Sequence, residues 1–65
     1  MFEVGDLLQR KKPFPEERDN LWLVIKVEHE DEIRPITFVT MMNCKNNYVS
    51  KFIGNIALDS FEKVE

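Results

Sequence analysis

The residues with the greatest potential for chemistry surround the only histidine of the chain. His29 stands between Glu28 and Glu30, and Asp31 and Glu32 follow directly. Imidazole nitrogens and carboxylate oxygens at this spacing can hold a divalent cation. No second histidine and no cysteine motif completes such a site. We therefore interpret this segment as a solvated acidic turn and predict no bound metal.

The single cysteine, Cys44, is the only other side chain suited to nucleophilic chemistry. Lys45 is its neighbour, but the sequence offers no partner acid or base. A glycine-rich phosphate loop and a serine elbow are also missing. We therefore predict a protein that is not an enzyme and carries no cofactor.

Length and composition predict one small domain, spanning residues 1–65. Its hydrophobic fraction of 43% is enough for a compact core, but a chain of 65 residues has no room for a deep catalytic cleft. A lone cysteine cannot form a disulfide within the monomer, which indicates a reducing compartment. The amino terminus lacks the features of a signal peptide, and the apolar run 21–25 is too short to span a bilayer. We expect a cytoplasmic protein without membrane contact.

Most of the chain has the pattern of β-strands. The run "LWLVIKVE" is rich in branched and aromatic residues, and "ITFVTMMN" is dominated by β-formers. The segment "ALDS" is typical of a single helical turn. The expected strands cover residues 3–10, 21–28, 36–43, 46–54 and 61–65, and the helical turn covers residues 57–60.

Five short strands predict an all-β fold that curls into a small, partly open barrel, because an open flat sheet leaves edges that pair with other chains. The two glycines, Gly5 and Gly54, are expected at sharp bends or positive φ. The predicted core consists of Leu7, Leu23, Ile25, Val27, Phe38 and Ile53.

The order of these features resembles the Src-homology-3-like small barrels, of the free-standing kind found among small bacterial and tailed-phage proteins. The resemblance rests on "VGDLL" at residues 4–8, a long polar first loop, three β-rich runs and a short helical turn before "FEKV". It implies a five-stranded barrel whose long first loop, residues 9–20, borders a ligand groove. The paired tyrosines of the proline-peptide binders are missing, so the resemblance does not carry that function over.

The first loop contains an unusual aromatic residue, Phe14, held between Pro13 and Pro15 in "KKPFPEERDN". The prolines could present Phe14 as a rigid anchor for a partner, or Phe14 could fold back and cap the barrel. Trp22 has the same two alternatives, as an interface anchor or as a cover for a barrel edge.

We predict from these residues a protein-interaction module that docks on a partner protein, which could belong to a host, and modulates it. Phe14 and Trp22 are the predicted anchors. The other predicted partner-binding residues are Arg10, Lys11, Lys12, Glu16, Glu17 and Tyr48. The acidic segment is expected to steer association through Glu28, Glu30, Asp31 and Glu32.

The alternative function is a nucleic-acid-binding barrel, although the net charge of −3 opposes it. In that hypothesis, Trp22, Tyr48 and Phe52 stack on bases. Arg10, Lys11, Lys12, Lys45 and Lys51 contact phosphates. A homodimer is compatible with either function, formed by edges that pair across a two-fold axis next to exposed Val24, Met41 or Tyr48.

Overall fold

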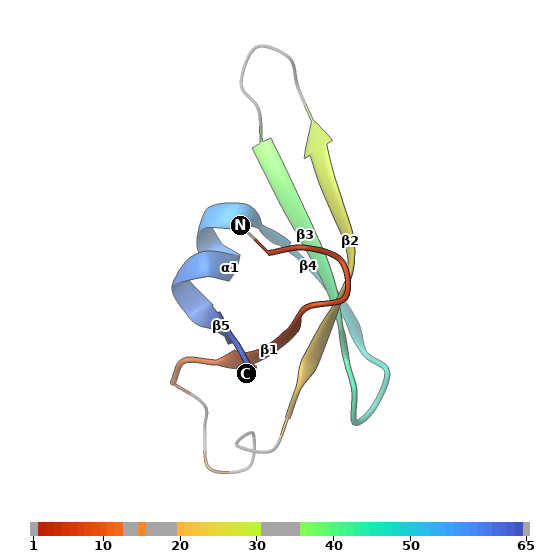
Figure 1. The fold of residues 1–65 in the computed structure, drawn as a ribbon, viewed down its shortest axis with the longest axis vertical. Coiled ribbons are helices and arrows are strands. Elements are labelled where there is room, and N and C mark those ends of the chain that lie inside the picture. Colours follow the sequence, from red (N-terminus) through yellow and green to blue (C-terminus); the bar gives the residue numbers. More distant parts are fainter. Residues whose placement is uncertain (1, 13–14, 16–19, 31–35, 65) are drawn as a thin grey trace.

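Five antiparallel strands and one short helix make up the fold in the computed structural model (Figure 1). The structure describes residues 2–12, 15, 20–30 and 36–64. The elements in chain order are β1 (Leu7–Arg10), β2 (Trp22–Glu30), β3 (Ile36–Asn43), β4 (Val49–Ile53), α1 (Gly54–Ser60) and β5 (Phe61–Lys63).

The strands form one sheet in the order β4-β3-β2-β1-β5. The two longest strands, β2 and β3, lie in its middle and contain the runs of branched and aromatic residues that predicted them. Strands β4 and β5 form its two edges, and within the described residues they do not pair with each other. The fold is therefore mostly β, with an open sheet and no closed barrel.

Helix α1 is longer than the single turn predicted from the sequence. It begins directly after β4, with Ile53 as an extended N-cap, and ends at Ser60. The N–H of Phe61 donates to the carbonyl of Ala57 and so closes the last turn. The helix packs against β3, β4 and β5 and lies on one side of the sheet (Figure 1).

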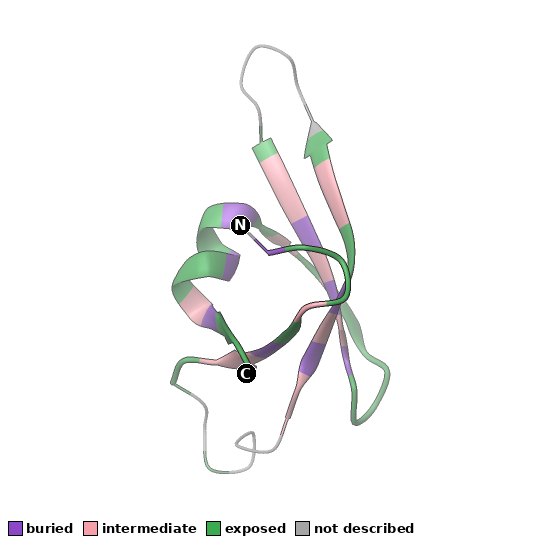
Figure 2. Ribbon diagram, in the orientation of Figure 1, coloured by how far each residue is buried: buried purple, intermediate pink, exposed green. Residues whose placement is uncertain are grey.

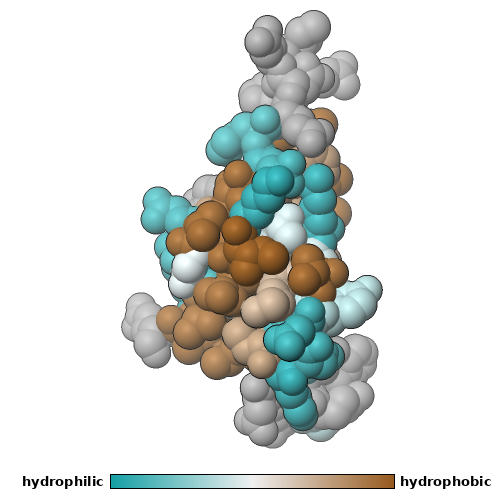
Figure 3. All heavy atoms as spheres, turned by 90° about the vertical axis from the view of Figure 1, so that its right-hand side faces the viewer, coloured by the Kyte–Doolittle hydropathy of each residue, from teal (hydrophilic) through white to brown (hydrophobic). Residues whose placement is uncertain are grey.

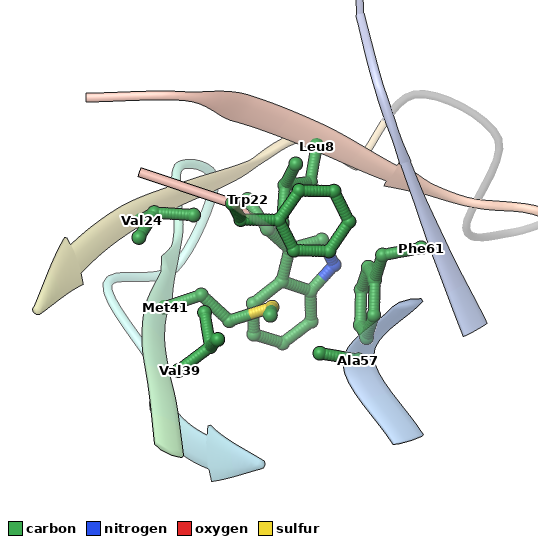
Figure 4. Close-up of a cluster of buried hydrophobic side chains, with 8 residues drawn as sticks. Leu8, Trp22, Val24, Val39, Met41, Ala57 and Phe61 are labelled. Carbon is green, nitrogen blue, oxygen red and sulfur yellow. The ribbon is translucent and has the colours of Figure 1, made fainter. Parts of the chain in front are cut away.

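The core fills the space between this helix and the sheet (Figures 2 and 4). Trp22 and Phe61 meet edge to face, with ring centroids 5.9 Å apart. The Phe52 ring lies on Phe61 as well, in a tilted arrangement with 5.4 Å between the centroids. Edge-to-face rings of this kind add attraction beyond the burial of area. The buried residues are Phe2, Leu8, Trp22, Val24, Val39, Met41, Ala57 and Phe61.

The predicted core was mostly on the wrong face of the sheet. Leu7, Ile25 and Ile53 are exposed, and Leu23 and Phe38 are only partly buried. Val27 alone among the predicted residues packs against the core. The prediction failed because both faces of β2 carry apolar side chains, so alternation alone cannot say which face turns inward.

A β-bulge between Val24 and Lys26 contributed to the same error. Val24 pairs with Met41 and Lys26 pairs with Thr40, so Ile25 is the extra residue. A bulge shifts the alternation of a strand by one position. Val24 and Val27 therefore face the core on either side of it, although they are three positions apart.

The motif "VGDLL" begins in a tight turn at Val4 and Gly5 and continues into β1 at Leu7. The N–H of Asp6 donates to the carbonyl of Glu3 at 3.0 Å, and Gly5 has a φ of 96°. This conformation is accessible to glycine because it lacks a Cβ, which confirms the predicted bend at Gly5. Gly54, in contrast, is the first residue of α1.

Asp6 makes the stability of this turn dependent on pH. The N–H of Glu3 donates to its carboxylate at 2.8 Å, and Lys63 lies 3.4 Å from the same oxygen. The Glu3 hydrogen bond first, and Lys63 second, hold the pKa of the Asp6 carboxyl below its ordinary value.

We predict that Asp6→Asn weakens the acid sensitivity of the fold. Because the pKa of Asp6 is lower in the folded state, its charge stabilises the fold above the unfolded pKa, and this contribution is lost as the pH falls through the folded pKa. At neutral pH the variant should have a lower melting temperature than the parent. On acidification its melting temperature should fall by less than that of the parent. Thermal melts over a pH series measure this, with Asp59→Asn as the control. The prediction would be contradicted if the melting temperatures of the parent and of Asp6→Asn fell equally as the pH is lowered.

Candidate functional site

The outer face of the sheet, on the side away from α1, carries a continuous row of apolar side chains. Leu7 pairs with Leu23, Leu23 with Met42, and Met42 with Val49. The neighbours of these residues along each strand include the buried Leu8, Trp22 and Met41, so the row itself faces outward. We call Leu7, Leu23, Met42 and Val49 the outer row.

The outer row crosses four neighbouring strands and spans roughly 14 Å, given about 4.8 Å between adjacent strands. Its two ends are well exposed, with Leu7 at 40% and Val49 at 51%, while Leu23 and Met42 between them are half-buried. Figure 3 views the right-hand side of Figure 1 and shows apolar atoms gathered in the middle of this face, with hydrophilic residues around them. The face thus has the apolar centre and polar rim of an interaction surface.

A set of paired charges borders the outer row. Glu28 lies 3.7 Å from the ammonium of Lys26 and 3.5 Å from that of Lys51. The Lys51 ammonium also lies over the ring of Phe38, 4.7 Å from its centroid. Partly exposed ion pairs add little stability, so we assign this group to the polar rim of the surface.

The basic residues predicted to bind a partner lie together at the end of β1. Arg10, Lys11 and Lys12 line a hollow of about 280 Å³ with Asp59 and Ser60. The Arg10 guanidinium packs 5.1 Å from the centroid of the Phe61 ring. Asp59 places a negative charge in the same hollow, so its lining carries both signs of charge.

The two described aromatic residues of the predicted surface have opposite environments. Trp22 is only 7% exposed and belongs to the core of the domain, between the sheet and α1 (Figure 4), so it is neither an exposed anchor nor the cover of a barrel edge. It offers almost no area to an anchor contact. Tyr48, in the turn before β4, is 63% exposed.

Several predicted residues lie outside the described part of the chain. These are Phe14, Glu16, Glu17, Asp31 and Glu32, together with the side chain of Glu30. The anchor role of Phe14 and the steering role of the acidic segment stay predictions. Glu28, the one described side chain of that segment's acidic residues, is engaged with Lys26 and Lys51.

The histidine and the cysteine considered for chemistry are both exposed. The Nδ1 of His29 forms a hydrogen bond with the Thr37 hydroxyl at 3.0 Å, and Cys44 is a free thiol on the surface. Within the described residues, no group of three or more His, Cys, Asp or Glu side chains could hold a metal ion.

Sequence reasoning missed the outer row because it placed two of its members, Leu7 and Leu23, in the core. The signal for the row was present in the sequence as the second apolar face of the strands. Val24 and Met41, which were considered as exposed residues beside a dimer edge, are instead fully buried. That part of the prediction is wrong, because these side chains alternate with Leu23 and Met42 and point to the opposite face.

Comparison with known proteins identifies no family for this chain. No family model, no curated protein and no solved structure matches it. In the part of the chain that the structure describes, no helix is long and apolar enough to cross a membrane. The findings define a small domain with a five-stranded antiparallel sheet and one short helix.

Proposed function

We propose that this protein is a non-enzymatic interaction module that docks on a partner protein and modulates it. The observation that carries this proposal is the outer row, which leaves apolar side chains of four neighbouring strands in contact with solvent. Contiguous apolar patches with a polar rim mark interaction sites on soluble proteins. The row replaces Trp22 as the central contact, while Phe14 stays a predicted additional anchor.

The partner should offer a complementary apolar strip bordered by polar groups. Met42 lies in the middle of the outer row, and its flexible thioether can adapt to an uneven partner surface. The rim of Lys26, Glu28 and Lys51 supplies both signs of charge, which favours specificity over raw affinity.

We also propose that the domain is a relative in architecture of the Src-homology-3-like small barrels, in a partly open form. Strand β1 pairs on one side with β2 and on the other with β5, and a short helix precedes β5. A long connection, from Lys11 to Leu21, separates β1 from β2. These features agree with the topology that the resemblance implies.

The nucleic-acid alternative finds less support in the positions of its residues. Trp22 is buried, and Phe52 packs against Phe61. Tyr48 is the well-exposed member of the three residues predicted to stack on bases. We therefore favour a protein partner.

We predict that Met42→Asp abolishes capture of the partner while the domain stays folded. A charge in the centre of a desolvated apolar contact costs several kcal/mol, so binding should weaken on the order of 100-fold or more. Affinity capture from a cell lysate with the parent chain as bait, followed by titration of the captured protein, measures this effect.

Leu58→Asp is the matched control, because it places the same charge on an exposed apolar position of α1, away from the outer row. It should capture the partner as well as the parent does. Equal loss of binding in both variants would contradict the assignment of the outer row. So would undiminished binding by Met42→Asp.

A further inference from the structure

Strand β4 forms an open edge of the sheet, and it lacks the features that commonly prevent another strand from pairing with such an edge. The opposite edge, β5, is only three residues long and carries Glu62 and Lys63, which are common devices against edge pairing. Strand β4 has five residues, and no described strand pairs with its outer side. The β4 edge is therefore longer and more open to pairing with another strand than the β5 edge.

The lysine that could block the β4 edge is folded back over the sheet. Lys51 stands in the middle of β4, where an outward ammonium would discourage an incoming strand. Its ammonium instead lies 3.5 Å from Glu28 of β2 and 4.7 Å from the centroid of the Phe38 ring of β3. Both partners belong to strands on the inner side of β4, so the charge points away from the open edge.

The hairpin between β3 and β4 determines which backbone groups of β4 are free. The Asn43 N–H donates to the Tyr48 carbonyl at 2.7 Å, and the next pair along the ladder is Met42 with Val49. Hydrogen-bonded and non-hydrogen-bonded pairs alternate in an antiparallel ladder. The backbone groups of Ser50 and Phe52 therefore face β3.

It follows that the N–H groups of Val49, Lys51 and Ile53 point to the open edge, with the carbonyls of Val49 and Lys51. The Ile53 carbonyl has another role, because Ile53 is the N-cap of α1 and its carbonyl begins the helix. The open edge thus presents three donors and two acceptors in an extended, five-residue strand.

We infer that β4 pairs with β4 of a second copy of this chain across a two-fold axis at Lys51. In this antiparallel register, the two Lys51 residues exchange two backbone hydrogen bonds, and each Ile53 N–H donates to the Val49 carbonyl of the other copy. On the outer face, Val49 lies opposite Ile53 of the second copy. The edge is therefore complementary to itself in both hydrogen bonding and apolar contacts.

The exposed apolar side chains support this register. Val49 and Ile53 are 51% and 45% exposed, and Tyr48 and Ile56 next to the strand are also exposed. The pairing joins the two sheets edge to edge and leaves the outer row accessible except at Val49. The inference does not rest on the proposed function.

The test compares Lys51→Pro with Lys51→Ala by analytical ultracentrifugation over a range of protein concentrations. Both variants lose the ion pair with Glu28, but only proline removes the N–H that points to the open edge. We expect the parent and Lys51→Ala to dimerise with rising concentration and Lys51→Pro to stay monomeric. A constant monomer mass for the parent, or an undiminished dimer of Lys51→Pro, would overturn the proposal.

Amide hydrogen exchange of the parent chain supplies a second readout that needs no variant. The amides of Lys51 and Ile53 should exchange more slowly at high protein concentration, because they are bonded only in the dimer. The pairing would be refuted if the exchange rates of these two amides did not depend on protein concentration. This test remains valid if Lys51→Pro fails to fold, because it uses only the parent chain. Met42→Asp should leave the dimer intact. That result would distinguish the β4 edge, which forms the dimer, from the outer row, which binds the partner protein.

Discussion

Replacing Met41 with aspartate should unfold the domain, whereas the same replacement at Met42 should leave it folded. Met41 is 0% exposed and packs among Val24 and Val39 in the core, while Met42 is half-buried on the outer face. Truncating a buried methionine costs about 2–5 kcal/mol, and burying a polar group without partners adds about 1–3 kcal/mol.

The expected loss, about 3–8 kcal/mol in sum, is comparable to the whole free energy of unfolding of a domain of this size. At about 0.05–0.15 kcal/mol per residue, a chain of 65 residues has a free energy of unfolding of roughly 3–10 kcal/mol. Circular dichroism in the far and near ultraviolet distinguishes the two variants. If Met42→Asp unfolded and Met41→Asp did not, the orientation of β3 described above would be inverted.

Phe61→Ala should reduce the free energy of unfolding by about 3–5 kcal/mol, which leaves the domain marginal or unfolded. Phe61 is 1% exposed at the start of β5 and contacts both Trp22 and Phe52. Its loss opens a cavity between α1 and the sheet and removes the ring over which Arg10 packs. Urea titration followed by Trp22 fluorescence measures the change, because the indole lies against the missing ring.

Tyr48→Ala is the matched control for this prediction, since it removes an aromatic ring that is largely in solvent. Its effect should stay within about 0.5 kcal/mol, as is usual for surface substitutions. A urea midpoint for Phe61→Ala equal to that of the parent would mean that the ring does not stabilise the core.

These two pairs of variants also separate stability from binding. Met42→Asp and Tyr48→Ala change only surface groups, so any loss of partner or dimer in these variants can be assigned to contacts. Variants at Met41 or Phe61 would lose every function together through unfolding. A substitution of Trp22 by alanine belongs to this second class as well, because Trp22 is a core residue.

The sequence by itself determined most of the secondary structure. The runs of branched and aromatic residues located β2 and β3, and the predicted bounds of the latter, residues 36–43, agree with the structure. Gly5 identified the bend before β1, because a positive φ is accessible to glycine without a Cβ clash. Such features depend on residues near one another in the chain, and local preference is enough to predict them.

Only the tertiary structure decided which face of the sheet is the core. In "LWLVIKVE" the set that begins at Leu21 is wholly apolar, but Trp22 and Val24 of the other set are apolar as well, so alternation alone did not identify the buried face. The choice came from distant residues: Ala57 of α1 and Phe61 of β5 cover the side of Trp22 and Val24, and the bulge at Ile25 keeps Val27 on that side. Leu7, Leu23, Met42 and Val49 were thereby left outside as the outer row. Burial depends on what packs against a strand, and that partner was set by the fold of the whole chain.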